Sequence, residues 1–159
     1  MEIRLAAMDD LAAVTALEAV CFPPAEAAQE DSLRARLAVY PNHFWLLENE
    51  GRLVSFVNGL VTDAYDLTDE MFDDASYHSE NGGWQIFGVA THPDYQRRGC
   101  AEKLLRYVVE QARQQGRKGL VLTCKEHLLH FYGKVGFVDE GISDSTHGGA
   151  VWHKMRLTF

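Results

Sequence analysis

The chain has 159 residues, of which 47% are hydrophobic, and its formal net charge is −8 at pH 7. This length predicts one domain, residues 1–159, with a sizeable core. The acidic balance argues against a basic nucleic-acid-binding surface, and no apolar run reaches the roughly 18 residues of a membrane span. Met1–Arg4 lacks a signal-peptide pattern, and three cysteines without CxxC spacing favour reduced thiols, so a cytoplasmic protein is expected.

Hydrophobic periodicity and turn residues divide the chain into strands and helices. Asp9 or Asp10 caps the first helix, Phe22-Pro23-Pro24 ends it, and residues 49–52 are typical of a hairpin turn. A long acidic connection, 62–83, then leads to a nearly continuous apolar run that is typical of a central strand. The order βααβββαβαββ predicts a mixed α/β domain with a central sheet of about seven strands flanked by four helices. The predicted strands are 3–6, 44–48, 53–61, 84–91, 119–124, 137–141 and 150–157, and the predicted helices are 11–21, 29–39, 99–115 and 126–135.

Residues 89–101 carry the clearest chemical signal in the chain. They read as a strand, a sharp turn and the start of a helix, with Gly99 and Ala101 as small residues at the helix entrance. The unpaired N–H groups of a first helical turn and the helix dipole favour an anion, and Arg97 and Arg98 add positive charge. A pyrophosphate held without metal is the functional interpretation, and an ordinary solvated strand–helix junction is the structural alternative.

Two motifs carry a family resemblance. Gln96-Arg97-Arg98-Gly99-Cys100-Ala101 is similar to the acetyl-CoA loop of the GNAT-superfamily N-acetyltransferases, Gln/Arg-x-x-Gly-x-Gly/Ala. Residues 130–137 contain that superfamily's second signature, Phe-Tyr-x-x-x-Gly-Phe, and Phe131 follows Gln96 by 35 positions. The resemblance spans essentially the whole chain. Shorter strings at 21–28, 53–57, 66–68, 88–93 and 122–124 resemble the arylalkylamine (serotonin-type) N-acetyltransferases and their bacterial relatives.

The resemblance implies one N-acetyltransferase domain whose sheet splays after its fourth strand to admit acetyl-CoA, the acetyl donor. The Val89 N–H then faces the thioester oxygen and stabilises the oxyanion, and Tyr132 donates a proton or hydrogen bond to the departing thiolate. A core aromatic is the structural alternative for Tyr132, and Cys100 is expected to be a passive loop thiol. The implied acetyl-CoA contacts are Val89, Ala90, Thr91, Gln96, Arg97, Arg98, Gly99, Cys100, Ala101, Glu102 and Tyr132.

The general base is where this sequence departs from the resemblance. The arylalkylamine enzymes have a His-x-His arrangement on the central strand, whereas the matching positions here are Gln85 and Phe87. Neither side chain accepts a proton at neutral pH. Gln85 is therefore expected to hold a proton-relaying water, or the substrate is an amine of low pKa that needs no strong base. The alternatives left open are His78, Glu80, Glu18 and Glu26, acting through water.

The resemblance places Phe22, Pro23, Pro24, Glu26 and Thr123 at the acceptor site, with Glu26 pairing with the amine. A row of carboxylates between residues 62 and 83 either attracts a cationic amine or forms a solvated loop. Nearby aromatic side chains either hold an aryl group or a cation or anchor that loop. The carboxylates are Asp63, Asp66, Asp69, Glu70, Asp73, Asp74 and Glu80, and the aromatics are Tyr65, Phe72, Tyr77 and Trp84.

The expected function is transfer of an acetyl group from acetyl-CoA directly to a small primary amine, an arylalkylamine or a polyamine. The alternatives are a weakly catalytic CoA-binding sensor or partner module and a peptide N-terminal acetyltransferase. No nucleic-acid or membrane partner is expected. His127 and His130, spaced i, i+3, are read as solvated, so no metal site is predicted. Residues 151–155 are either the edge of a homodimer or a buried closing strand.

Overall fold

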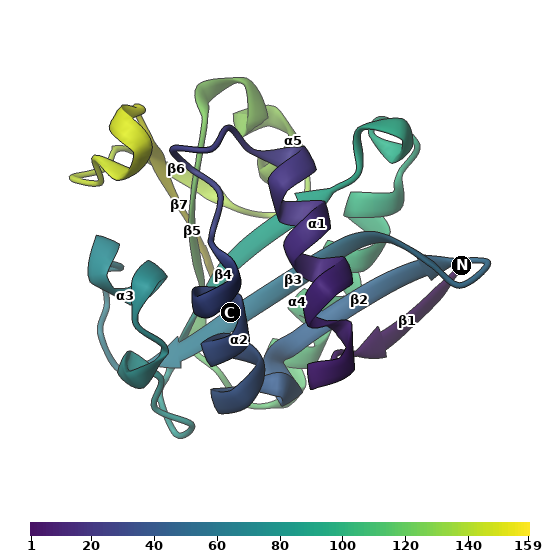
Figure 1. Cartoon of the computed structure of the whole chain (residues 1–159). Helices are drawn as coiled ribbons and strands as arrows, with labels where there is room; N and C mark the ends of the chain where they lie inside the picture. The colour runs from purple at the N-terminus through teal and green to yellow at the C-terminus, as the bar shows by residue number, and fades with distance from the viewer.

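A computed structural model describes residues 1–159, and a mixed seven-stranded sheet forms its centre (Figure 1). The strands are β1 (Glu2–Leu5), β2 (Phe44–Asn49), β3 (Arg52–Thr62), β4 (Trp84–Thr91), β5 (Gly119–Cys124), β6 (Val138–Ile142) and β7 (His153–Thr158). They lie in the order β1-β2-β3-β4-β5-β7-β6, and only β4 and β5 pair in parallel. The predicted fold class, a mixed α/β sheet of about seven strands, is confirmed.

The structure has five α-helices instead of the four predicted: α1 (Leu11–Cys21), α2 (Glu30–Val39), α3 (Asp69–Asp73), α4 (Cys100–Gln114) and α5 (Leu129–Gly133). The additional helix, α3, lies in the acidic connection between β3 and β4. Its five residues are too few to give a periodic signal. The predicted helix 126–135 is shorter than expected, because a 3-10 turn occupies Glu126–Leu128 before α5 begins.

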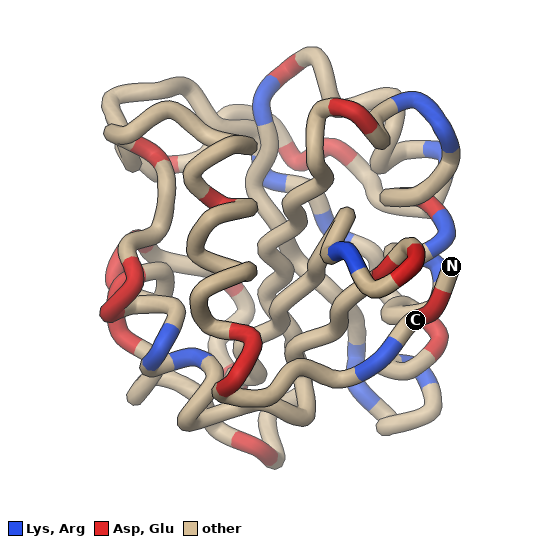
Figure 2. The backbone as a smooth tube through the Cα atoms, turned by 45° about the vertical axis from the view of Figure 1, so that its right-hand side comes forward, with Lys and Arg blue, Asp and Glu red and all other residues tan.

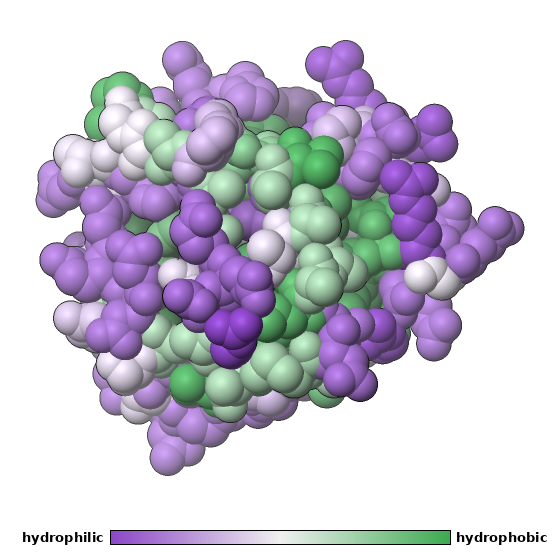
Figure 3. Space-filling view, in the orientation of Figure 1, coloured by the Kyte–Doolittle hydropathy of each residue, from purple (hydrophilic) through white to green (hydrophobic).

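Helices cover both faces of the sheet, with α1 and α2 in front and α4 behind in Figure 1. A core on the α4 side contains the buried leucines Leu104 and Leu105, and a second core contains Leu17 of α1 and Leu33 of α2. The outer face of α1 carries no charge, and Figure 3 shows apolar surface over this helix. These two layers leave the carboxyl ends of the central strands open for a site between them.

The central strands β4 and β5 separate part of the way along. Pairing between them is confined to Trp84–Ile86 against Gly119–Val121, although β4 continues to Thr91 and β5 to Cys124. β4 stays paired with β3 over its whole length, and β5 stays paired with β7. The predicted splay after the fourth strand is therefore present, and it opens between two halves of the sheet whose strands stay paired.

The acidic connection is anchored along its length. Asp66 accepts hydrogen bonds from Lys154 and Arg156, at 2.7 and 3.1 Å. Asp69 accepts one from Ser145 at 2.5 Å, and Glu80 is within 2.8 Å of two histidine nitrogens. Acidic and basic positions are interspersed in Figure 2. Three of the seven carboxylates between residues 62 and 83 thus help to hold the connection in place, and the expected attraction of a cationic amine stays a prediction.

The closing strand β7 lies between β5 and β6, so it is an interior strand. Residues 153–155 of the predicted homodimer edge are consequently paired on both sides, because β6 returns along β7 and takes the edge position. Residues 153–155 therefore belong to a closing strand, as one of the two expectations has it, but only Met155 of this segment is buried and Val151 is exposed. None of the helices is both long and apolar enough to cross a lipid bilayer.

Candidate active site

A cavity of about 940 Å³ occupies the opening between β4 and β5. It extends from the α4–α5 side of the sheet, where Gln96 and Phe131 line it, to the α1–α2 side, where Phe22 and Arg36 line it. Thr123, expected at the acceptor site, also lines the cavity. One continuous space therefore has room for two molecules that meet at the splayed strands.

The start of α4 forms one end of this cavity. Gly99 caps the helix in a left-handed conformation (φ 79°), and Arg97 is also left-handed (φ 60°). The first N–H bonded along the helix is that of Lys103, which donates to Gly99 O at 2.9 Å. The preceding N–H groups, Arg97 to Glu102, have no acceptor in the protein. Such a row at a positive helix end fits a phosphate or pyrophosphate group without a metal.

The backbone of β4 faces the opening. His92 N–H donates to Val54 O of β3 at 2.8 Å, and Ala90 O accepts from Ser55 Oγ. Because successive residues of a strand alternate in direction, the N–H of Val89 and the C=O of Thr91 point away from β3, into the gap. On that side, Thr91 O accepts hydrogen bonds from two side chains, Cys21 Sγ at 3.2 Å and Gln96 Nε2 at 3.3 Å. The Val89 N–H is thus directed toward the cavity, as expected.

Tyr132 of α5 lines the same opening. Its ring packs edge-on against Phe131 and Phe137, with centroids 5.0 and 5.9 Å away, and its side chain is buried. Burial, reinforced by the nearby Cys124, raises the pKa of the Tyr132 hydroxyl well above its ordinary value. The hydroxyl therefore stays protonated at neutral pH and is available as a donor.

Four of the expected site residues do not line the cavity: Gln85, Arg98, Cys100 and Pro24. Gln85 is fully buried, and its Nε2 donates to Gly59 O at 3.0 Å while Oε1 has no partner. Arg98 lies over the ring of Tyr95, and of the two expected prolines only Pro23 lines the cavity. Expected residues that do line it are Val89, Ala90, Thr91, Gln96, Arg97, Gly99, Ala101, Glu102, Tyr132, Phe22, Pro23, Glu26 and Thr123.

Glu18 of α1 is a buried carboxylate at the other end of the cavity, 5% exposed. Its one hydrogen bond comes from Ala28 N–H, 2.9 Å from Oε2, so Oε1 is free. Burial raises the pKa of Glu18, against the effects of this hydrogen bond and of the Arg36 and His147 charges. Glu26, which was expected to pair with the amine, already pairs with Lys125 at 2.8 Å.

His147 lines the cavity, although no motif in the sequence singles it out. It comes from the segment 143–152 between β6 and β7, and its Nε2 lies 2.7 Å from the carbonyl oxygen of Glu26. Its ring centroid is 4.2 Å from that of Phe72, which in turn lies under the Arg36 guanidinium. Partners this distant in the sequence leave no local pattern.

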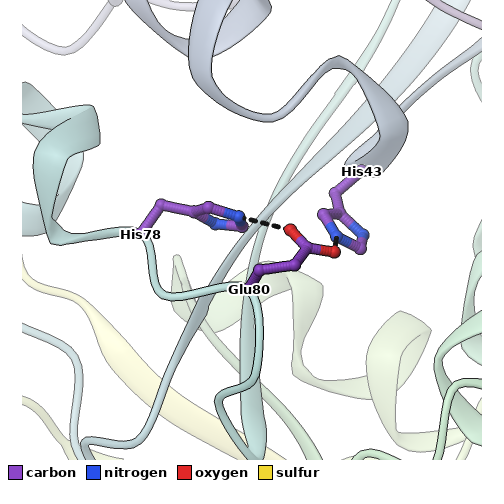
Figure 4. A group of neighbouring side chains, drawn as sticks. All are labelled: His43, His78 and Glu80. Atoms are coloured by element: carbon purple, nitrogen blue, oxygen red, sulfur yellow. Dashed lines mark hydrogen bonds and ion pairs between the residues drawn. The ribbon is translucent and has the colours of Figure 1, made fainter.

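Two histidines and a carboxylate meet outside this cavity (Figure 4). Glu80 lies 2.8 Å from the Nε2 atoms of both His43 and His78. His78 Nδ1 accepts a hydrogen bond from the Val61 N–H at 3.0 Å, so the neutral ring carries its proton on Nε2. That Nε2 donates to Glu80 and has no lone pair for a metal. The cluster joins the 3-10 turn just before β2 (Pro41–His43) to the acidic connection through hydrogen bonds.

Comparison with known proteins identifies a family that agrees with this geometry. The chain belongs to the Acetyltransferase (GNAT) family, whose sequence profile matches residues 11–137. It is 29% identical over 130 residues to the serotonin N-acetyltransferase of Mesocricetus auratus, across 80% of this chain and 61% of that protein. It is 30% identical over 116 residues to the tRNA(Met) cytidine acetyltransferase TmcA of Aeropyrum pernix, across 67% of this chain but 16% of that protein. The chain therefore spans less than two thirds of the length of either relative.

Two solved structures are similar over nearly the whole chain. A GNAT-like decarboxylase, GphF, in complex with isobutyryl-CoA superimposes with a TM-score of 0.84 at 20% identity, covering 99% of both chains. The protein yncA of Salmonella typhimurium with its cofactor acetyl-CoA gives a TM-score of 0.73 at 20% identity, covering 99% of this chain and 93% of that one. At this identity the likeness supports the fold and leaves the reaction of this chain to be argued from its own residues.

Proposed function

We propose that residues 1–159 act as an acetyl-CoA-dependent N-acetyltransferase on a small primary amine. The observation that carries the proposal is the joining, in one cavity, of a helix end with free N–H groups, the gap-facing N–H of Val89 and the protonated hydroxyl of Tyr132. These groups match the parts of a thioester that need support: the phosphates, the carbonyl oxygen and the sulfur.

Each group in the cavity has its own role in the proposed acetyl transfer. The backbone from Arg97 to Glu102 binds the pyrophosphate, and Val89 N–H donates to the thioester oxygen as negative charge develops there. The amine nitrogen attacks the carbonyl carbon directly, the C–N bond forms, and the C–S bond breaks with its electron pair on sulfur. Tyr132 gives a proton or hydrogen bond to that sulfur. A reduced, cytoplasmic setting suits the three free cysteines.

A small amine is the acceptor that the far end of the cavity favours. Three segments surround this end of the cavity: 22–28, 66–72 and 143–152. Hydrogen bonds from the last segment to Asp69 and to the Glu26 carbonyl oxygen hold them together. Phe22, Phe72 and Trp152 give this end an aromatic wall, and Glu18 Oε1 is a free acceptor for an ammonium group. An arylalkylamine fits this wall better than a polyamine does. A peptide N-terminus or a purely CoA-binding role remain the rival functions.

The test is thiol release from acetyl-CoA with a panel of amines that spans arylalkylamines, polyamines, amino acids and short peptides. Turnover selective for arylalkylamines supports the proposal in its finer form. Turnover with polyamines alone keeps the acetyltransferase and replaces the substrate, and turnover with peptides alone favours the N-terminal acetyltransferase. CoA binding by calorimetry without turnover of any amine overturns the proposal in favour of a sensor.

A further inference from the structure

The cavity needs a group that takes a proton from the incoming ammonium, and β4 does not supply it. Gln85 and Phe87 cannot accept a proton, and Gln85 lies outside the cavity. Among the other acidic or basic side chains at the amine end, Glu26 is paired with Lys125, Asp69 with Ser145 and Thr146, and Arg36 with Asn58 and Phe72. Glu18 and His147 are the two groups left with a free acceptor atom.

The geometry points to His147 as the proton acceptor for the amine; this inference rests on the proposed function. Its Nε2 lies 2.7 Å from Glu26 O, and a carbonyl oxygen can only accept, so Nε2 carries the proton. The neutral ring therefore has its lone pair on Nδ1, which makes no hydrogen bond in the protein. An imidazole held in this tautomer at a cavity wall is arranged as a general base.

The position of the imidazole is tightly constrained. The carbonyl oxygen of His147 accepts a hydrogen bond from Trp152 Nε1 at 2.9 Å. The imidazole ring of His147 packs on the ring of Phe72. The next residue, Gly148, is left-handed (φ 63°), and a Cβ there would lie 2.6 Å from Glu26 Cγ. The loop can approach Glu26 this closely only because residue 148 is glycine.

Glu18 complements His147 as a second titratable group with a free acceptor atom at the amine end. The same short segment anchors both groups, since Ala28 N–H donates to Glu18 and Glu26 O accepts from His147. Glu18, Arg36 and His147 all line the same cavity. A carboxylate here attracts the ammonium and also stabilises the imidazolium formed after proton transfer.

The proton balance of the step is simple. The ammonium gives one proton to Nδ1 of His147, and the neutral amine then attacks the thioester carbonyl. When the C–S bond breaks, the second proton lost by the nitrogen ends on the thiol sulfur, through the Tyr132 hydroxyl. The proton on His147 is released to solvent before the next turnover. The products are the acetamide, free thiol and one proton, without any oxidant or reductant.

The test compares two amines of nearly the same shape: the panel amine that the wild type acetylates fastest, and its β,β-difluoro analogue, whose pKa is lower. His147→Gln keeps an amide donor toward Glu26 O and removes the base. Near pH 7 we expect a loss in kcat/KM of about 100-fold for the parent amine and of less than about tenfold for the analogue. The matched control is Trp152→Phe, which loosens the loop and leaves the imidazole, so both amines should lose rate equally.

Equal losses for both amines with His147→Gln would overturn the inference and leave His147 as a loop anchor. A wild type without turnover on any amine would overturn the proposed function, and the inference with it, so the two failures are distinguishable. A second variant guards against poor folding of the first. His147→Ala should regain rate in proportion to added imidazole if the ring is the base, and absence of this rescue in a folded variant that binds CoA would also overturn it.

Discussion

Tyr132 is the residue at which a single atom is expected to separate catalysis from binding. Tyr132→Phe removes the hydroxyl and keeps the ring that packs against Phe131 and Phe137. We expect kcat to fall about 100-fold or more, because loss of a positioned general acid typically has that effect, with CoA affinity changed less than about threefold. Thiol release and calorimetry measure the two quantities. Full turnover by a folded Tyr132→Phe variant would contradict the acid role.

Glu18 is the residue at which function and stability are expected to oppose each other. Glu18→Gln keeps an acceptor for Ala28 N–H and removes the charge. The KM for a cationic amine should rise about tenfold, the loss of roughly 1.4 kcal/mol of charge attraction, with the CoA dissociation constant unchanged. Steady-state kinetics at saturating acetyl-CoA checks this, and an unchanged KM would remove Glu18 from the amine site.

The same variant should be more thermostable, and the sign follows from the direction of the pKa shift. The pKa of Glu18 is raised in the folded protein, so folding takes up a proton between the unfolded pKa and the raised one, and stability falls as pH rises through that window. Glu18→Gln removes this loss. Its Tm should exceed that of the wild type near pH 8, and the difference should shrink as pH falls toward about 4. A constant difference across pH would contradict the assignment.

Single residues also show what the sequence can and cannot predict. Tyr132 and the loop at Gly99 were predicted because each lies in a contiguous motif whose geometry is local. Glu18 and His147 are both hydrogen-bonded to the loop 22–28, and His147 is 121 positions from the carbonyl that fixes its tautomer. No local pattern encodes such a contact. Gln85 was assigned by its place on β4, and the position alone did not reveal that its side chain lies outside the cavity.

Among the elements, α4 offers a matched pair of glycines. Gly99 at its start and Gly116 just after its end share a φ of 79°, and a Cβ at either position would meet no atom within 4 Å. Alanine at either position should therefore cost about 1 kcal/mol of stability through backbone strain alone. Only Gly99→Ala should raise the CoA dissociation constant, by about tenfold, because it disturbs the N–H groups from Arg97 to Glu102. Thermal melts and calorimetry on both variants provide the test, and equal CoA binding by the two would contradict the phosphate assignment.

Predictability also differs between elements. β4 and β5 were predicted with the bounds that the structure shows, because strands buried on both faces read as apolar runs with sharp ends. α3 was missed, since its stability comes from contacts that are made in the fold. Asp69 in its first turn is bonded to Ser145 and Thr146, more than 70 positions away. Short elements held by distant partners lie beyond what periodicity can show.

For the whole molecule, the two ends of the cavity are built from different parts of the chain, and this predicts independence. The α4 end depends on residues 96–102, whereas the amine end depends on Asp69, which holds the segment 143–152 across the opening. Asp69→Ala should raise the KM for the amine with little change in CoA affinity, opposite to Gly99→Ala. In the double variant the losses in kcat/KM should add, with a coupling energy below about 0.5 kcal/mol.

Non-additive losses in kcat/KM in the double variant would contradict the independence of the two ends. β4 runs between the two ends and carries Val89, the proposed oxyanion donor, so a flexible β4 would transmit a disturbance from one end to the other. The strand is paired with β3 at every position from Trp84 to Thr91, which argues for a rigid divider. A coupling energy well above about 0.5 kcal/mol would show that the splayed strand moves. The acetyl-CoA site and the amine site would then be energetically coupled through β4.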